Sequence, residues 1–213
     1  MTRRESPDMT LTLLHTAEAH RASFDRLRDK IAPGMRLEHV VRPDFLERAQ
    51  DGIDAALDAE ITTMIKAAPG PVICTCTTIG PAAARAGAIR VDWPMMQAAA
   101  ETKGAILMVY CLESTRAPSL ALLQDAMTAA NHPGPLVPLP LPALWPLFAE
   151  AKLADFAKAL ALAILKQAVQ MPDLGAIVLA QASMAGAAPM LEDLGVAVLS
   201  SPELALRVGL ARL

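Results

Sequence analysis

Aromatic residues are scarce in this chain of 213 residues, where Phe, Trp and Tyr together make up only 3%. Hydrophobic residues nevertheless make up 54% of the sequence. The core must therefore be built mainly from Ala, Leu, Val, Ile and Met. A chain of this length is long enough for one large domain or for two small lobes.

Cysteine is also rare, with three residues in the chain. Three cysteines are too few for a disulfide framework, and the odd number suits a reducing compartment. The first 20 residues contain two arginines but no adequate apolar stretch behind them, so a secretory signal is not expected. We therefore expect a cytoplasmic protein.

Long apolar runs and strong net charge are both missing. The longest apolar region, residues 153–171, is interrupted by Asp155, Lys158 and Lys166, which favours a buried or amphipathic helix over a membrane span. The net charge of −3 gives no reason to expect nucleic acid or an anionic membrane as a partner. The sequence is compatible with a homo-oligomer.

Motifs for nucleotides and metals are absent as well. No GxGxxG or P-loop pattern occurs, so nucleotide binding has no support. The histidines show no zinc spacing relative to Cys74 and Cys76, and no metal site is expected. The four histidines are His15, His20, His39 and His132.

Strand and helix patterns alternate along the whole chain. This alternation predicts an α/β protein with parallel sheets covered by helices on both faces. The expected strands are residues 9–15, 36–41, 71–78, 88–93, 105–112, 135–142, 176–183 and 196–200. The expected helices are residues 17–32, 43–68, 81–87, 94–103, 116–131, 143–171, 184–195 and 202–213.

The pattern also occurs twice. The stretch VICTCTTIGPAAA aligns with IVLAQASMAGAAP at a shift of 105 residues, and LTLLHTAEAH aligns with LMVYCLESTR at a shift of 96. This repeat predicts two pseudo-symmetric lobes, residues 1–103 and 104–195, with segment 196–213 able to pack back on the first lobe. Ligands of parallel sheets bind beyond the strand carboxyl ends, so the expected active site is the cleft between the lobes.

One stretch, Pro71 to Pro81, combines several signals of a site. An apolar β-branched run is followed by small polar residues and then by Gly80-Pro81, which predicts a strand, a turn and a helix start. Cys76 is then expected at the strand tip, where a helix N-terminus favours an anion and a thiolate. Alternatively, Cys74 and Cys76 are small hydrophobic residues of a buried strand.

Four segments together resemble the aspartate/glutamate/hydantoin racemase superfamily. They are CTCTTIGPAA, VDWPM, CLESTRAPS and GAIVLAQASMAG, and the resemblance extends over nearly the whole chain. It implies two pseudo-symmetric α/β lobes with the site between them. It also implies cofactor-free chemistry at a carbon next to a carboxyl or carbonyl group of a small molecule. In the racemases, two cysteines, one from each lobe, face opposite sides of that carbon.

Cys76 matches the first cysteine of the family. Thr77, Thr78, Ser114 and Thr115 match positions that bind the substrate carboxylate. The position of the second cysteine is occupied by Gln181, which cannot exchange a proton near neutral pH but can form hydrogen bonds.

Two more family positions differ in this chain. Ser183 stands where glutamate racemases carry a histidine, and we include it among the expected substrate-binding residues. Their acidic residue after the first strand is absent, with His15 in that neighbourhood.

These departures leave three alternatives. The first is one-base chemistry, a decarboxylation or isomerisation in which Cys76 delivers a proton or adds to the substrate while Gln181 holds an oxygen. The second is a racemase or epimerase with a substitute base, for which Cys111 and His15 are the candidates. The third is a protein that binds a small carboxylate without chemistry.

Overall fold

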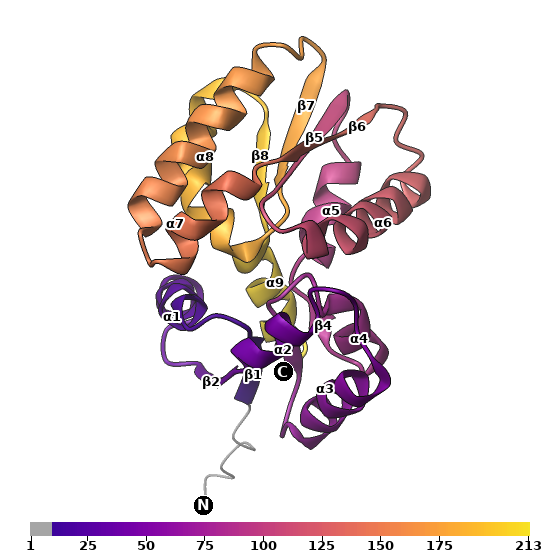
Figure 1. The fold of residues 1–213 in the computed structure, drawn as a ribbon, viewed down its shortest axis with the longest axis vertical. Coiled ribbons are helices and arrows are strands. Elements are labelled where there is room, and N and C mark those ends of the chain that lie inside the picture. The colour runs from indigo at the N-terminus through magenta and orange to yellow at the C-terminus, as the bar shows by residue number, and fades with distance from the viewer. Residues whose placement is uncertain (1–9) are drawn as a thin grey trace, which may run out of the picture.

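The computed structural model describes residues 10–213 and contains two separate sheets of four parallel strands (Figure 1). The first sheet has the order β2-β1-β3-β4 and the second has the order β6-β5-β7-β8. The two orders are equivalent, so the predicted pair of pseudo-symmetric α/β lobes is confirmed. The strands are β1 (Thr10–His15), β2 (Arg36–Val41), β3 (Val72–Cys74), β4 (Ile89–Arg90), β5 (Ala105–Tyr110), β6 (Leu136–Pro140), β7 (Leu174–Leu179) and β8 (Ala197–Ser200).

In the first lobe, the helices are α1 (Ala19–Ile31), α2 (Pro43–Arg48), α3 (Ala55–Ala67) and α4 (Gly80–Arg85). The single helix expected over 43–68 is wrong, because α2 and α3 are separate. Gly52 between them has a φ of 120°, which a helix cannot accommodate. Asp54 then begins α3 by accepting a hydrogen bond from the backbone N–H of Leu57 at 2.7 Å.

In the second lobe, the helices are α6 (Glu113–Ala129), α7 (Trp145–Ala149) and α8 (Leu153–Ala168), with 3-10 segments η1 (Pro142–Leu144) and η2 (Ala182–Leu194). The expected helix over 143–171 is divided because Ala151, between α7 and α8, has a φ of 57°. The helix expected over 184–195 is present as a 3-10 segment that contains Pro189, whose missing N–H disfavours α-helical hydrogen bonding.

Two helices pack on the lobe that lies across from their own strands. Helix α5 (Trp93–Ala100) follows β4, yet its Met95 and Met96 are buried against Met108 of the second sheet. Helix α9 (Ser201–Leu210) follows β8, yet its Leu206 is buried against Leu11 of the first sheet. The chain boundary at residue 103 therefore stays a prediction, since helices cross it in both directions.

Most strands are shorter than predicted, although β2 has the predicted bounds. Strand β3 ends at Cys74 rather than at residue 78, and β4 contains only two residues. Residues 75–79 lie beyond the strand and form the turn that leads into α4. The backbone N–H of Thr75 still donates to β1, at 2.9 Å from the carbonyl oxygen of Leu14. Met9, the first residue of the first expected strand, lies outside the described residues. Within residues 10–213, no helix is long and apolar enough to cross a bilayer.

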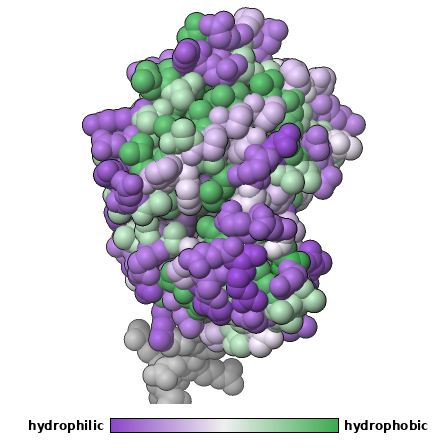
Figure 2. Space-filling model, viewed as in Figure 1, coloured by the Kyte–Doolittle hydropathy of each residue, from purple (hydrophilic) through white to green (hydrophobic). Residues whose placement is uncertain are grey.

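On the face seen in Figure 2, the two lobes differ in the hydropathy of their exposed residues. Figure 2 shows hydrophilic residues gathered on the first lobe, whereas apolar residues are more frequent on the second lobe in this view. On α8, Leu162 is 71% exposed and Val169 is 78% exposed. The expected homo-oligomer stays a prediction.

Candidate active site

Segments that follow β1, β3, β5 and β7 meet in one small cavity between the lobes. Since these are the two central strands of each parallel sheet, their carboxyl ends point to the same place. The cavity has a volume of about 30 Å³, close to the share of one water molecule in liquid water. Its lining comprises Thr16, Ala17, His20, Leu46, Thr75, Cys76, Thr77, Thr78, Leu112, Thr115, Trp145, Gln181, Ala182 and Ser183.

Cys76 lies in the wall of this cavity and is 9% exposed. Burial raises the pKa of its thiol above the ordinary value of 9.0. Hydrogen bonds from the Thr16 hydroxyl and from the backbone N–H groups of Ile79 and Thr78 act in the opposite direction. The predicted preference for a thiolate is therefore wrong for the free protein, because the cost of burying the charge outweighs the donors around it.

Gln181 faces the same cavity and is held in one orientation by the second lobe. Its Oε1 accepts hydrogen bonds from the backbone N–H groups of Cys111 at 2.6 Å and Leu112 at 3.0 Å. Only the amide oxygen can accept two N–H donors, so the assignment of the amide is fixed. The NH₂ group at the other corner of the amide is the part that Gln181 can offer to a ligand.

The predicted carboxylate-binding hydroxyls connect the two lobes. Thr77 Oγ1 donates to the carbonyl oxygen of Ala180 at 3.1 Å, and Thr78 Oγ1 lies 3.2 Å from Ser114 Oγ. Thr115 is buried in the cavity wall, and Ser183 is half-buried there. Ser114 does not line the cavity, but its hydroxyl lies within hydrogen-bond distance of Thr78, which does.

The two candidates for a second base lie behind the cavity wall. His15 is fully buried, with Nδ1 2.8 Å from Thr75 Oγ1 and Nε2 2.8 Å from His39 Nδ1. Burial, with smaller effects of nearby histidines, lowers the His15 pKa to about 2, so the ring is neutral. Cys111 packs in the hydrophobic cluster of the second lobe, where burial raises its pKa to about 12.

Solved structures of racemases share this arrangement of strands and helices. A glutamate racemase isoform from Bacillus anthracis aligns with 95% of this chain and 81% of its own, at 16% identity and a TM-score of 0.67. An aspartate racemase from Picrophilus torridus aligns over 95% and 93%, at 12% identity and a TM-score of 0.62. An allantoin racemase from Klebsiella pneumoniae aligns over 95% and 86%, at 15% identity and a TM-score of 0.58.

The fold is that of these racemases. The resemblance to the aspartate/glutamate/hydantoin racemase superfamily is thus confirmed at the level of the fold. No protein-family model and no curated protein sequence matches the chain. Identities of 16% or less do not carry the racemases' substrates or residue roles over to this protein.

The internal repeat aligns the two halves of the site on this racemase fold. It pairs Cys76 with Gln181 and Thr78 with Ser183, and all four residues line the cavity. The shorter shift of the first strands pairs Thr16 with Leu112, which also line it. That pairing was a usable signal for Thr16, which sequence reasoning missed.

Three further lining residues were missed for a different reason. His20, Leu46 and Trp145 come from α1, α2 and the start of α7. They reach the cavity only through the packing of helices, and no motif in the sequence marks them. The ring of His20 packs beside that of Phe148 at a tilt, with ring centroids 5.7 Å apart, so His20 contacts the second lobe although it belongs to the first.

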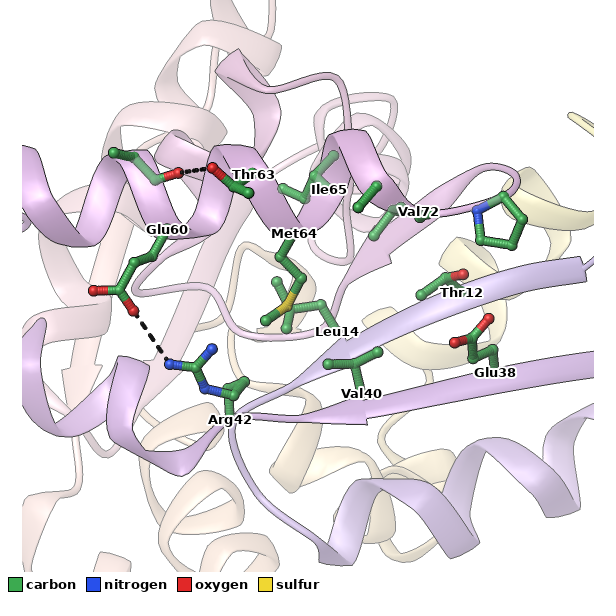
Figure 3. A pocket seen from close by; sticks show the side chains of 14 residues that line it. Thr12, Leu14, Glu38, Val40, Arg42, Glu60, Thr63, Met64, Ile65 and Val72 are labelled. Carbon is green, nitrogen blue, oxygen red and sulfur yellow. Dashed lines mark hydrogen bonds and ion pairs between the residues drawn. The ribbon is translucent and has the colours of Figure 1, made fainter.

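A larger cavity of about 590 Å³ lies elsewhere, between α3 and the first sheet (Figure 3). Its wall is mainly apolar, with Leu14, Val40 and Met64 pointing into it and the Arg42–Glu60 ion pair at one end. Among the described residues, no cysteine or histidine lines it. Size alone would favour this cavity, whose lining includes the carboxylates of Glu38 and Glu60. The thiol of Cys76 and the imidazole of His20, however, line the smaller cavity between the lobes.

A metal centre has no ligand set in the described part of the chain. Within residues 10–213, no three His, Cys, Asp or Glu side chains converge as metal ligands would.

Cys74, two residues before Cys76, is fully buried, and its thiol donates to the carbonyl oxygen of Cys76 at 3.4 Å. Its side chain is part of the hydrophobic core of the first lobe.

Proposed function

We propose that this protein is a cofactor-independent enzyme that protonates a carbon next to a carboxylate or carbonyl group of a small molecule. Cys76 is the proton donor, and the substrate is held between the two lobes. The observation that carries this proposal is a buried thiol at the meeting point of four strand ends, surrounded by hydrogen-bond donors. The racemase fold is compatible with this chemistry.

The raised pKa of Cys76 decides the direction of proton transfer. A thiol that keeps its proton at neutral pH is an acid and gives its proton to a carbanion-like centre. In the decarboxylation that we favour, the bond between the α-carbon and a carboxylate breaks, CO₂ leaves, and the electron pair remains on the α-carbon. The S–H bond of Cys76 then breaks as the new C–H bond forms, and solvent returns a proton to the thiolate.

Gln181 complements this step from the second lobe. Because its oxygen is occupied by two backbone N–H groups, its NH₂ group can donate to the oxygen on which negative charge develops. Protonation from one thiol on one side also predicts a product of a single configuration. No second acid is required on the opposite face, which fits the replacement of the second cysteine by glutamine.

Binding requires the lobes to separate from the position seen here. A cavity of about 30 Å³ cannot hold a carboxylic acid of several heavy atoms. The hydroxyls of Thr77, Thr78 and Ser114 bond across the cleft, and they can turn toward a substrate carboxylate once the lobes part. Thr115 and Ser183 supply further hydroxyls in the same wall.

The test is proton NMR in D₂O with substituted malonates, amino acids, hydantoins and hydroxy acids, together with a chiral assay of each product. We expect CO₂ loss from a substituted malonate, with one deuterium incorporated at the α-carbon and one enantiomer formed. Cys76→Ala should abolish this reaction, whereas Cys111→Ala, a matched change of a buried cysteine, should retain it. Turnover by Cys76→Ala at the wild-type rate would refute the role of Cys76.

The second candidate is binding without chemistry. It is favoured by Gln181, which stands where the racemases carry a cysteine that transfers a proton. In that case, ligands would raise the melting temperature of wild type and Cys76→Ser equally, and no sample would exchange or lose a group. Inversion of an amino acid would instead indicate a second base, and His15 and Cys111 would be tested next.

A further inference from the structure

A second cleft opens beside the cavity that contains Cys76. It has a volume of about 520 Å³ and shares three lining residues with the smaller cavity, His20, Ala182 and Ser183. Its walls come from α1 of the first lobe and from α7, α8 and η2 of the second. Figure 1 shows α1 directly beside α7, where the two lobes approach each other.

The lining of this cleft is mostly apolar. Phe24 and Leu27 of α1 face Phe148, Leu153 and Ala157 across it. Leu153, at the start of α8, is 42% exposed and adds an apolar side chain to the wall of this cleft. The charged side chains in the lining, Arg26 and Lys30, both come from α1.

The cavity at Cys76 and the cleft beside it differ greatly in volume. The cavity at Cys76 has a volume of about 30 Å³, whereas small-molecule sites commonly enclose about 300–1,000 Å³. The neighbouring cleft has that size and the apolar lining typical of such sites. A molecule that places its carboxylate at Thr77 and Thr78 can extend past His20 into this cleft.

We infer, on the basis of the proposed function, that this cleft is a subsite for an apolar, uncharged substituent on the α-carbon of the substrate. The substrate class is therefore a carboxylate with a branched alkyl or similarly bulky group, rather than a small unsubstituted acid. His20 lies at the boundary of the two spaces and contacts the substituent where it joins the α-carbon.

Gly186 in η2 offers a way to fill the subsite without disturbing the backbone. A Cβ added there would meet only Ala157 Cβ at 3.6 Å, an ordinary contact, and Gly186 does not have a positive φ. Larger side chains at this position extend into the cleft. The series Gly186→Ala, Gly186→Val and Gly186→Leu therefore reduces the available space in steps.

The experiment is calorimetric titration of malonate and isobutylmalonate into wild type and the three variants. We expect wild type to bind isobutylmalonate at least tenfold more tightly than malonate. Gly186→Leu should remove most of this preference, and Gly186→Ala should retain it. Ala67→Leu, which fills the unrelated cavity beside α3, should leave the preference unchanged.

Equal binding of the two malonates by wild type, or binding of neither, would overturn the inference. A preference that survives Gly186→Leu would also overturn it, and Gly186→Val gives the same test if the leucine variant does not fold. A preference without any decarboxylation would refute the proposed function while supporting the subsite.

Discussion

At the scale of single residues, the protonation state of Cys76 decides whether its side chain acts as a proton donor or as a proton acceptor. Its pKa lies above 9.0 because it is buried. A proton donor must carry its proton before the reaction, and the thiol does so at every pH below that pKa. We therefore expect kcat for α-carbon protonation to stay constant from pH 6 to pH 9, by analogy with general acids whose pKa exceeds the assay pH.

A stopped-flow or NMR rate profile over this range checks the expectation. The rate should fall only above pH 9, as the thiol loses its proton. A rate that rises steadily between pH 7 and pH 9 would show that the thiolate is the active form. The racemase or epimerase alternative, in which a thiolate can remove a proton from the substrate, would then be preferred to decarboxylation.

Two buried histidines make stability depend on pH. The folded-state pKa values are about 2 for His15 and about 4 for His20, both lowered mainly by burial from 6.5. Below pH 6.5 the unfolded chain binds protons that the folded protein does not, so stability falls as the pH decreases. Each histidine then removes about 2 kcal/mol from the unfolding free energy between pH 7 and pH 5.

The change His20→Leu isolates one of these contributions. Urea unfolding at pH 7 and pH 5 should show a fall in stability that is about 2 kcal/mol smaller in the variant than in wild type. The carboxylates contribute equally to both proteins, so they cancel in the comparison. An identical fall in both would mean that His20 is protonated within the folded protein at pH 5.

At the scale of elements, α6 contains a buried hydroxyl without a partner. Ser119 is 0% exposed, and its Oγ has no hydrogen-bond partner among the described residues. Ser119→Ala removes an unsatisfied polar group and has a better helix propensity, so we expect a gain of about 1 kcal/mol in stability. Thermal and urea unfolding measure this gain.

Ser23→Ala is the matched control, because the Ser23 hydroxyl is half-buried and donates to the carbonyl oxygen of Ala19 in its own helix. This control should change stability by less than about 0.5 kcal/mol. A loss of stability in Ser119→Ala would contradict this expectation, because it would mean that the Ser119 hydroxyl stabilises the folded protein.

The elements also show what sequence patterns can predict. Runs of Val, Ile and Leu predicted the central strands β1, β5 and β7, because buried parallel strands are apolar on both faces. The patterns did not reveal the breaks near Gly52 and Ala151, where a left-handed backbone interrupts otherwise helical composition. Helical periodicity describes side chains and is insensitive to one residue of unusual backbone conformation.

For the candidate site, too, the positions of residues were predictable from the sequence, whereas the environment of Cys76 was not. Cys76, Thr77, Thr78, Thr115 and Gln181 were predicted to share a cleft, and all five line one cavity, because strand order and repeat symmetry fix where strand ends meet. The chemical roles of these residues stay predictions. The raised pKa of Cys76 was not predictable, because it depends on how completely the two lobes exclude water from the thiol.

At the scale of the whole molecule, two hydroxyl hydrogen bonds join the lobes across the cleft at Cys76. Thr77→Val removes the bond to the carbonyl oxygen of Ala180 and leaves that acceptor without its partner. We expect the variant to favour an open arrangement and to react severalfold faster with iodoacetamide at Cys76. Peptide mapping after timed alkylation measures the rate at this residue.

Thr63→Val is the control, since the Thr63 hydroxyl bonds within α3 to the carbonyl oxygen of Ala59. It should alkylate at the wild-type rate. Equal rates for Thr77→Val and wild type would mean that the bond to Ala180 does not limit opening.

The crossing of α5 and α9 makes the folding of each half depend on the other half. Each half ends in a helix that covers the sheet of the other half, and the two halves share one order of strands. Two identical chains that exchanged their last helices would have the same arrangement. In such a pair neither chain covers its own sheet alone, and by the same reasoning we expect neither half of this protein to fold without the other.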